Sequence, residues 1–242
     1  MGQEIKVTGL VLQTGNIGEY DRRIVLLTKE RGRISAFARG AKKATSAYAA
    51  ACQLFTFGKF SLYEGKSSFN LMWAEVDNYF DELKKDLDLI YYGSYFCELA
   101  SYLTRENNDE LEILKLVYQS LRALEKKTIP PVLIRCIYEV KILAFYGIGM
   151  EVFQCVRCRG KENLTEFHPA EGGVVCSSCG TGKVSIGAST LYTLQFILCS
   201  SIEKLYTFRV SDEVLSELKK IIKEFMQIHI NHSFKSLIFL QE

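Results

Sequence analysis

Residues 155–180 read CVRCRGKENLTEFHPAEGGVVCSSCG, and no other segment of the chain restricts its possible folds as strongly. Four cysteines stand in two pairs, Cys155 with Cys158 and Cys176 with Cys179, and seventeen residues separate the pairs. Two thiolates at this spacing can reach one ion from a single tight turn, and two such turns supply the four ligands of a tetrahedral zinc site. The sequence therefore predicts one structural Zn²⁺ with no open coordination position.

The residues around these cysteines complete the pattern of a zinc ribbon. Gly160 and Gly180 follow the two pairs, where glycine lets the backbone curl and point its amides at the sulfurs. Residues 165–167 and 174–175 are predicted to form two short strands between the pairs. We predict a four-cysteine zinc ribbon at about residues 153–182, and disulfides or unrelated buried thiols are the alternatives that the spacing leaves open.

The sequence on both sides of the ribbon has helical periodicity. From residue 80 onward, apolar residues recur at i, i+3 and i+4. A proline pair opens one helix, and Ser211 is a good N-cap for the last one. Helices are predicted at about residues 83–99, 111–124, 130–147, 188–200 and 212–230. We predict a mainly helical domain over residues 80–242 that the ribbon interrupts.

The first eighty residues follow strand patterns instead. Five short strands with almost no helix suggest a small closed barrel, and the OB-fold is the commonest five-stranded solution. The strands are predicted at about residues 4–14, 22–28, 33–39, 55–63 and 69–76. The overall prediction is an α+β chain, with an OB-fold domain at residues 1–79.

Positive charge is concentrated in the predicted barrel. The 242 residues have a formal net charge of +2 and are 48% hydrophobic, which is ample for a packed core. Arg22–Lys66 contains ten basic and two acidic side chains, a net charge of +8, whereas residues 81–242 carry −2. A basic patch confined to one small module is typical of a polyanion site.

The predicted strand at residues 33–39 is the sharpest signal for nucleic acid. Alternation places its small apolar residues on the barrel interior and the other residues outside. An outward aromatic ring between guanidinium groups suits a single strand, because rings stack bases and cations hold phosphates. A solvated edge strand, with its ring packed under a helix, is the alternative, and the two faces could be exchanged. The candidate DNA-binding residues are Arg33, Phe37, Arg39, Lys42 and Lys43.

Sequence patterns of common enzyme classes are missing. The chain contains no phosphate loop, no Gly-x-Ser-x-Gly elbow and no His-Glu-x-x-His. We therefore predict a protein that is not an enzyme. No apolar run approaches the ~18 residues that a membrane span needs, and no signal peptide is recognisable. The remaining cysteines lie in apolar surroundings and are predicted to be reduced core thiols of a cytosolic protein: Cys52, Cys97, Cys136 and Cys199.

The order of barrel, helices, ribbon and helices resembles the RecO family of bacterial recombination mediators. The resemblance covers essentially the whole chain and is weakest after about residue 200. Four segments carry most of it: Gly9-Leu-Val-Leu12, Val25-Leu-Leu-Thr28, Arg31-Gly-Arg-Ile-Ser-Ala-Phe-Ala-Arg-Gly-Ala-Lys42 and Cys136-Ile-Tyr-Glu-Val-Lys-Ile-Leu-Ala-Phe-Tyr-Gly147.

The resemblance implies more than the residues alone. RecO-like proteins bind single- and double-stranded DNA and anneal complementary strands in the bacterial cytoplasm, associated with the nucleoid during repair. They contact the acidic C-terminal tail of single-stranded DNA-binding protein and act with RecR to load RecA. The OB-fold is their main DNA and RecR surface, which corresponds here to Arg33, Arg39, Lys42 and Lys43. A zinc-ribbon factor associated with RNA or transcription is the rival that the bare residues allow.

Overall fold

The computed structural model describes residues 2–66, 68–180 and 183–240 of the chain. Ser67 and residues 181–182, the last two of the predicted ribbon, lie outside the described residues. The chain divides into two compact units, the first formed by Met1–Lys126 with Phe234–Glu242 and the second by Lys127–Ser233. The predicted domain boundary between residues 79 and 80 stays a prediction.

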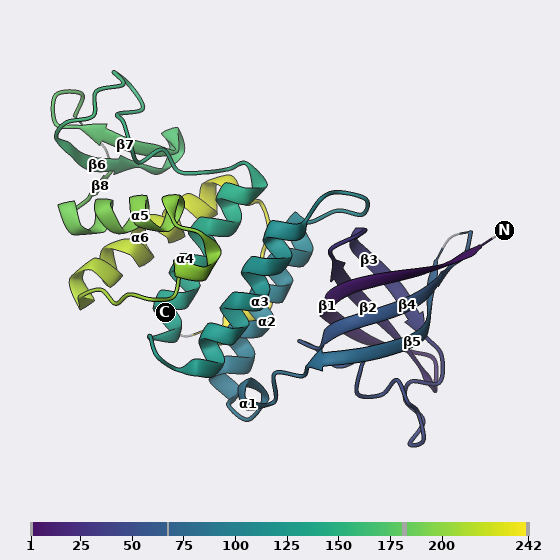
Figure 1. The fold of residues 1–242 in the computed structure, drawn as a ribbon. Helices are drawn as coiled ribbons and strands as arrows, with labels where there is room; N and C mark the ends of the chain where they lie inside the picture. The colour runs from purple at the N-terminus through teal and green to yellow at the C-terminus, as the bar shows by residue number, and fades with distance from the viewer. Residues whose placement is uncertain (1, 67, 181–182, 241–242) are drawn as a thin grey trace. The chain divides into compact units, whose positions relative to one another are not determined.

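Five strands of the first unit close into a barrel, as predicted (Figure 1). Around the ring the order is β1-β2-β3-β5-β4, with β4 paired back to β1. All neighbours are antiparallel except β3 and β5, which run parallel, and this is the OB-like arrangement. The strands are β1 (Gln3–Ile17), β2 (Asp21–Thr28), β3 (Gly32–Ala38), β4 (Phe57–Glu64) and β5 (Phe69–Asn78).

The side-chain pattern of each strand explains which face it buries. On β3, Ile34, Ala36 and Ala38 point into the barrel core, as alternation predicts, while the residues between them are half-buried. On β2, by contrast, the run Ile24–Thr28 is buried on both faces. One of these faces lines the core, and helices of the same unit pack near the other face of β1 and β2. A strand covered on both sides is expected to be continuously apolar, which this one is.

Three helices follow the barrel in the first unit: α1 (Asp81–Lys84), α2 (Leu87–Leu103) and α3 (Leu111–Lys126). The sequence predicts one helix over about residues 83–99, and this is wrong in one respect. The backbone of Asp86 is extended, and its side chain accepts a hydrogen bond from the amide of Leu89 at 3.4 Å. Asp86 thereby N-caps α2 and separates it from the single turn of α1.

Residues 234–240 return to the first unit and pack on α2. The ring of Phe234 lies edge-on to Tyr95 and Tyr102, with centroid distances of 5.7 and 5.8 Å. The two carboxylate oxygens of Glu98 accept hydrogen bonds from the amides of Lys235 and Ser236, each at 3.0 Å. These amides lie at the start of the 3-10 turn η3 (Ser236–Phe239), where backbone N–H groups have no partner within the turn. Glu98 therefore accepts the hydrogen bonds that these donors require.

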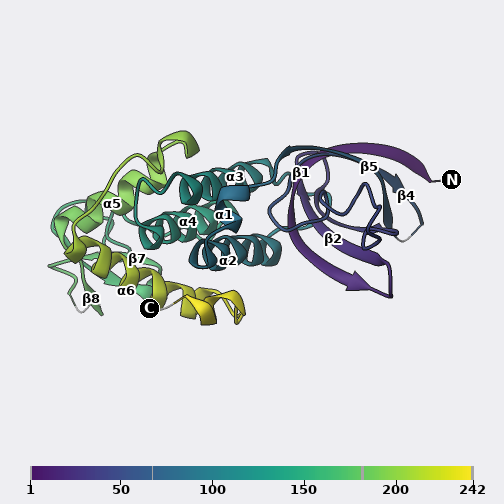
Figure 2. The same cartoon turned by 90° about the horizontal axis from the view of Figure 1, so that it is seen from below.

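The second unit combines three helices with the ribbon. Helix α4 packs against α5 and α6 (Figures 1 and 2). The ribbon sheet has the order β7-β6-β8, which confirms the two predicted strands and adds a third. Its elements are α4 (Pro131–Tyr146), β6 (Leu164–His168), η1 (Pro169–Glu171), β7 (Gly173–Cys176), β8 (Val184–Ser185), α5 (Ala188–Cys199), η2 (Ile202–Lys204) and α6 (Asp212–His229).

A buried lysine joins two helices of this unit. Lys141 on α4 is only 6% exposed, and its ammonium donates hydrogen bonds to the carbonyls of Ile197, Leu198 and Ser200 at 2.8–3.2 Å. These carbonyls end α5, where the helix dipole is negative and backbone acceptors have no helical partner. Within the described residues, no helix combines the length and the apolar character that a membrane span requires.

Candidate metal centre and nucleic-acid surface

The four cysteines predicted as metal ligands meet at one end of the ribbon. The sulfurs of Cys155, Cys158, Cys176 and Cys179 all lie within 4.8 Å of one another, and the Cys158 and Cys176 sulfurs are 3.6 Å apart. A tetrahedron with zinc–sulfur distances of about 2.3 Å has edges of roughly 3.8 Å. The donor set and its spacing therefore fit a four-coordinate Zn²⁺ bound by protein ligands alone.

Each cysteine pair lies in a hydrogen-bonded turn. The amide of Arg159 donates to the carbonyl of Cys155 at 2.9 Å, and the amide of Gly180 donates to Cys176 at 3.1 Å. Gly180 has a positive φ of 41°, as expected for a glycine that curls the chain. In the first turn the expectation is wrong, because Arg159 takes the positive φ of 64°. A Cβ on Gly160 would lie 3.4 Å from the sulfur of Cys158, which is an ordinary contact distance, so the space around Gly160 does not require a glycine.

Backbone amides prepare one of the sulfurs for ionisation. Burial opposes the thiolate of Cys155, but hydrogen bonds from the backbone of Cys158, Cys176 and Arg157 outweigh it and lower the pKa of this thiol to about 6. The opposite holds for Cys179, where hydrogen bonds with the thiols of Cys158 and Cys176 raise the pKa to about 12. A cation at the centre of the cluster would stabilise all four thiolates together.

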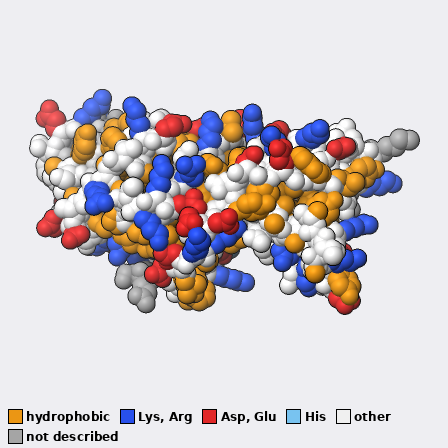
Figure 3. Space-filling view, turned by 60° about the horizontal axis from the view of Figure 1, so that its bottom comes forward, with side chains coloured by type: hydrophobic (Ala, Val, Ile, Leu, Met, Phe, Trp, Pro, Cys, Tyr) orange, Lys and Arg blue, Asp and Glu red, His pale blue; other side chains and the backbone are white. Residues whose placement is uncertain are grey.

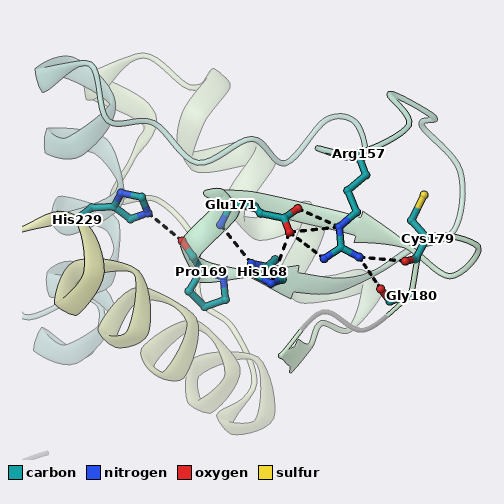
Figure 4. Close-up of polar contacts among 7 residues, drawn as sticks. All are labelled: Arg157, His168, Pro169, Glu171, Cys179, Gly180 and His229. Carbon is teal, nitrogen blue, oxygen red and sulfur yellow. Dashed lines mark hydrogen bonds and ion pairs between the residues drawn. The ribbon is translucent and has the colours of Figure 1, made fainter.

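Arg157 connects the two cysteine turns (Figure 4). It lies between Cys155 and Cys158, and one terminal nitrogen donates to the carbonyls of Cys179 and Gly180 at 3.0 and 2.7 Å. The Nε and the other terminal nitrogen bind the carboxylate of Glu171 at distances down to 2.8 Å. The guanidinium group thus holds the second turn against the first through a planar, two-sided set of hydrogen bonds.

The same network continues to α6. The amide of Glu171 donates to the Nδ1 of His168 at 3.2 Å, which caps η1. The Nε2 of His229 donates to the carbonyl of Pro169 at 2.8 Å (Figure 4). Sequence reasoning missed the roles of Arg157 and Glu171. The position of Arg157 inside a Cys-x-x-Cys pair was visible, but nothing in the spacing shows which carbonyls it reaches.

The predicted basic loop of the barrel is exposed. Arg39, Lys42 and Lys43 follow β3 directly, and all three side chains are open to solvent. Their loop is fixed to the start of β2, because the amide of Gly40 donates to the Asp21 carboxylate at 2.7 Å. No ion pair engages the three cations within the described part of the chain. Lys and Arg side chains also line the outer edge of the barrel in Figure 3.

The other two candidate residues are less free. Arg33 is half-buried, and its Nε donates to the carbonyl of Thr104 at 3.1 Å. Burial, followed by repulsion from Arg105 and Arg23, lowers the pKa of its guanidinium group. Phe37 is half-buried on the outward face of β3, as alternation predicts. The structure therefore places three candidates in solvent and anchors one against the chain that follows α2.

One cation that belongs to the same surface was not among the predicted residues. Arg23 on β2 lies directly opposite Phe37 on β3, and its Nε donates to the hydroxyl of Ser35 at 2.6 Å. The hairpin register would have identified it. With a tight turn at residues 28–32, antiparallel pairing puts Arg23 beside Phe37 on one face.

Comparisons with known families agree over nearly the whole chain. Residues 1–80 match the family described as "Recombination protein O N terminal", and residues 84–238 match "Recombination protein O C terminal". The first match ends where the barrel ends, and the second covers the helices and the ribbon. Together they leave only short segments unmatched.

Full-length relatives show the same similarity. The "DNA repair protein RecO" of Clostridium novyi is 32% identical over 96% of this chain and 91% of its own length. The protein of the same name from Symbiobacterium thermophilum is 31% identical, over 97% of this chain and 95% of its own. That of Bacillus subtilis is 28% identical, over 98% and 94%.

Proposed function

Because this chain belongs to the RecO family of DNA repair proteins, we propose that it binds single- and double-stranded DNA through its barrel and anneals complementary strands. The observation that carries the proposal is the exposed cluster of Arg39, Lys42 and Lys43 on a closed OB-like barrel. Cations in this setting bind phosphates by replacing the counterions that surround a nucleic acid.

Annealing by this surface needs no nucleotide energy. The barrier is the repulsion between the phosphates of two strands, and a segment of net charge +8 lowers it by neutralising and concentrating both strands. Base pairing then supplies the free energy. We therefore propose that the protein is a mediator and not an enzyme, and we expect it to anneal strands without ATP or Mg²⁺.

The metal part of the proposal concerns stability. Cys155, Cys158, Cys176 and Cys179 would hold one Zn²⁺, which supplies a tetrahedral cross-link and no reaction chemistry. Arg157 orients the second turn toward the first, and the backbone amides around Cys155 favour its thiolate. These contacts are made by the chain's own residues, so they reduce the rearrangement that metal binding requires.

The family membership also supports a set of partners. We propose that the chain contacts the acidic C-terminal tail of single-stranded DNA-binding protein and acts with RecR to load RecA onto coated strands. Members with these names come from bacteria, so the proposed compartment is the bacterial cytoplasm, with the nucleoid as the place of repair.

An annealing assay tests the proposal. Complementary strands should pair faster with the protein than without it, in the absence of ATP and Mg²⁺, and also when coated with single-stranded DNA-binding protein. Deleting the acidic tail of that protein should slow annealing of coated strands and leave bare strands unaffected. In a second experiment, unlabelled RNA or DNA competes with labelled single-stranded DNA for binding to the protein. If bare strands gain no rate and RNA competes better than DNA, the RNA-associated function becomes the better account.

A further inference from the structure

A cavity of about 380 Å³ opens on the barrel surface beside β3, within the first unit. It lies where β3 meets β5, and these parallel strands are joined over only two residue pairs, Ala36 with Phe69 and Phe37 with Asn70. The start of β3 is bridged instead to the segment after α2, because the amide of Arg33 donates to the carbonyl of Arg105 at 2.9 Å. The volume is within the range of small-ligand sites. Its lining includes Arg23, Ser35, Phe37, Lys66, Phe69 and Glu106.

The wall from β2 and β3 combines a ring with a cation. Phe37 and Arg23 are direct cross-strand partners, so both side chains lie on the same outward face. The hydrogen bond from Arg23 Nε to Ser35 uses one donor of the guanidinium group. Further N–H donors remain on the two terminal nitrogens. The face of an aromatic ring and a guanidinium plane are the two side-chain surfaces on which bases stack.

The charges of the lining argue against a phosphate. Arg23 and Lys66 are balanced by two carboxylates, those of Glu64 and Glu106. Glu64 forms an ion pair with Arg31 at 3.0 Å. For Glu106, no hydrogen bond or ion pair of its carboxylate is present within the described residues. Carboxylates repel a phosphate, whereas the edge of a nucleobase carries donors and acceptors together and matches a lining that offers both.

We propose that this cavity takes one unstacked base of a single strand, with the ring of the base on Phe37. The inference rests on the proposed function and assigns a specific place to the base, separate from the phosphate contacts. Arg39 follows Phe37 by two residues, roughly 7 Å along a strand. The cations of the exposed loop therefore begin one nucleotide's length from the base, where a phosphate of the same strand can lie.

The test separates bases from phosphates. Binding is measured to an oligothymidylate of about 16 nucleotides and to an abasic strand of equal length, which keeps every phosphate. The wild-type chain should bind the oligothymidylate more tightly. Phe37→Ala should weaken oligothymidylate binding about fivefold or more, as expected for the loss of one stacked base, with binding of the abasic strand unchanged. Phe37→Tyr should retain the wild-type preference.

Trp73→Ala is the matched control, because Trp73 is an aromatic residue of the same barrel that is 51% exposed and does not line the cavity. It should change neither affinity. A wild-type chain that binds both strands equally tightly would overturn the inference and leave the proposed function intact. A chain that binds neither strand would overturn the proposed function itself.

Cross-linking of the wild-type chain tests the same inference without any variant, so its result does not depend on whether a variant folds. Strands that carry 5-iodouracil should cross-link under ultraviolet light to the peptide that contains Phe37. Cross-links confined to other barrel peptides, or an equal loss of affinity in Phe37→Ala and Trp73→Ala, would overturn the inference.

Discussion

The barrel and the ribbon are both small β-structures, but different interactions hold them together. The barrel closes a ring of five strands of seven to fifteen residues around its own apolar core. The ribbon has strands of five, four and two residues, and its cysteine turns are joined by the hydrogen bonds of Arg157 and bring four sulfurs together. Burial and backbone pairing suffice for the first, whereas the second is small, buries Phe167 against Phe225 of α6, and would gain a cross-link from the proposed Zn²⁺.

Because of this difference, the surface residues of the barrel are available for binding, whereas those of the ribbon stabilise its own fold. The barrel can keep an exposed basic loop and a cavity on its surface because its stability comes from inside. The ribbon uses its polar residues, Arg157 and Glu171 among them, to hold its own turns together. We therefore expect damage to the two regions to have independent consequences, and the predictions below test that independence.

The largest effect should come from the metal ligands. Cys176→Ser should abolish stoichiometric zinc binding and destabilise the second unit strongly, because a structural Zn²⁺ contributes roughly 10–16 kcal/mol in isolated finger peptides. Zinc content by elemental analysis and thermal unfolding are the measurements. DNA affinity of the barrel should be largely retained.

The matched control is Cys199→Ser. The prediction of a core position for Cys199 is wrong, because this last residue of α5 is exposed, and it lies outside the cluster. This variant should keep one zinc per chain and wild-type stability. A wild-type protein that contains no metal after production with zinc would contradict the zinc proposal, and loss of DNA binding in Cys176→Ser would contradict the independence of the two regions.

Truncation in the barrel core should have the next largest effect. Leu26 is fully buried in this core, and Leu26→Ala should reduce the free energy of unfolding by about 2–5 kcal/mol. Denaturant unfolding measures it. Leu87→Ala, at a leucine that is 61% exposed, should cost less than about 0.5 kcal/mol. Zinc content should be the same in both variants, and a loss of zinc from Leu26→Ala would show that the two regions fold as one.

Removing the contact between the cysteine turns should be milder. Arg157→Ala should weaken zinc affinity about 10- to 100-fold, the usual range for residues that orient ligands, because the carbonyls of Cys179 and Gly180 lose their donor. Zinc transfer to a colorimetric chelator measures it. Arg157→Lys should recover little, since an ammonium cannot replace the planar pattern. Arg159→Ala, which removes the exposed neighbouring arginine, should behave as wild type.

The smallest effect concerns how DNA affinity depends on salt. If Arg39, Lys42 and Lys43 each hold one phosphate, their triple alanine variant should flatten the log–log salt dependence on single strands by about 2. The comparison is a triple alanine variant at Lys161, Lys183 and Lys220, three exposed lysines of the second unit, which should leave the slope unchanged. The opposite result would place the phosphate contacts on the second unit.

Most of the fold could be predicted because its signals are local. Strand alternation and helical periodicity lie within single elements, and the cysteine spacing alone identified four residues that meet in space. Element boundaries agree within a few residues for the barrel strands and for α3 to α6. The break before α2 was also a local signal, since Asp86 is a typical N-cap, but periodicity continued across it.

What could not be predicted depends on residues far apart in the chain. The carbonyl that anchors Arg33 belongs to Thr104, and the carboxylate that receives residues 235 and 236 belongs to Glu98. The reach of Arg157 to Cys179 depends on how the two turns face each other. No periodicity or spacing encodes such pairs, because they follow only after the elements have packed.

The return of residues 234–240 to α2 has a consequence for synthesis on the ribosome. The barrel and the first three helices are complete once residue 126 has emerged, but their last partner is made 108 residues later. At 5–20 residues per second the delay is roughly 5–20 s. During that interval Tyr91, Tyr95 and Tyr102 lack the aromatic partners Phe239 and Phe234. The nascent first unit therefore presents an incomplete apolar face until the whole second unit has been translated.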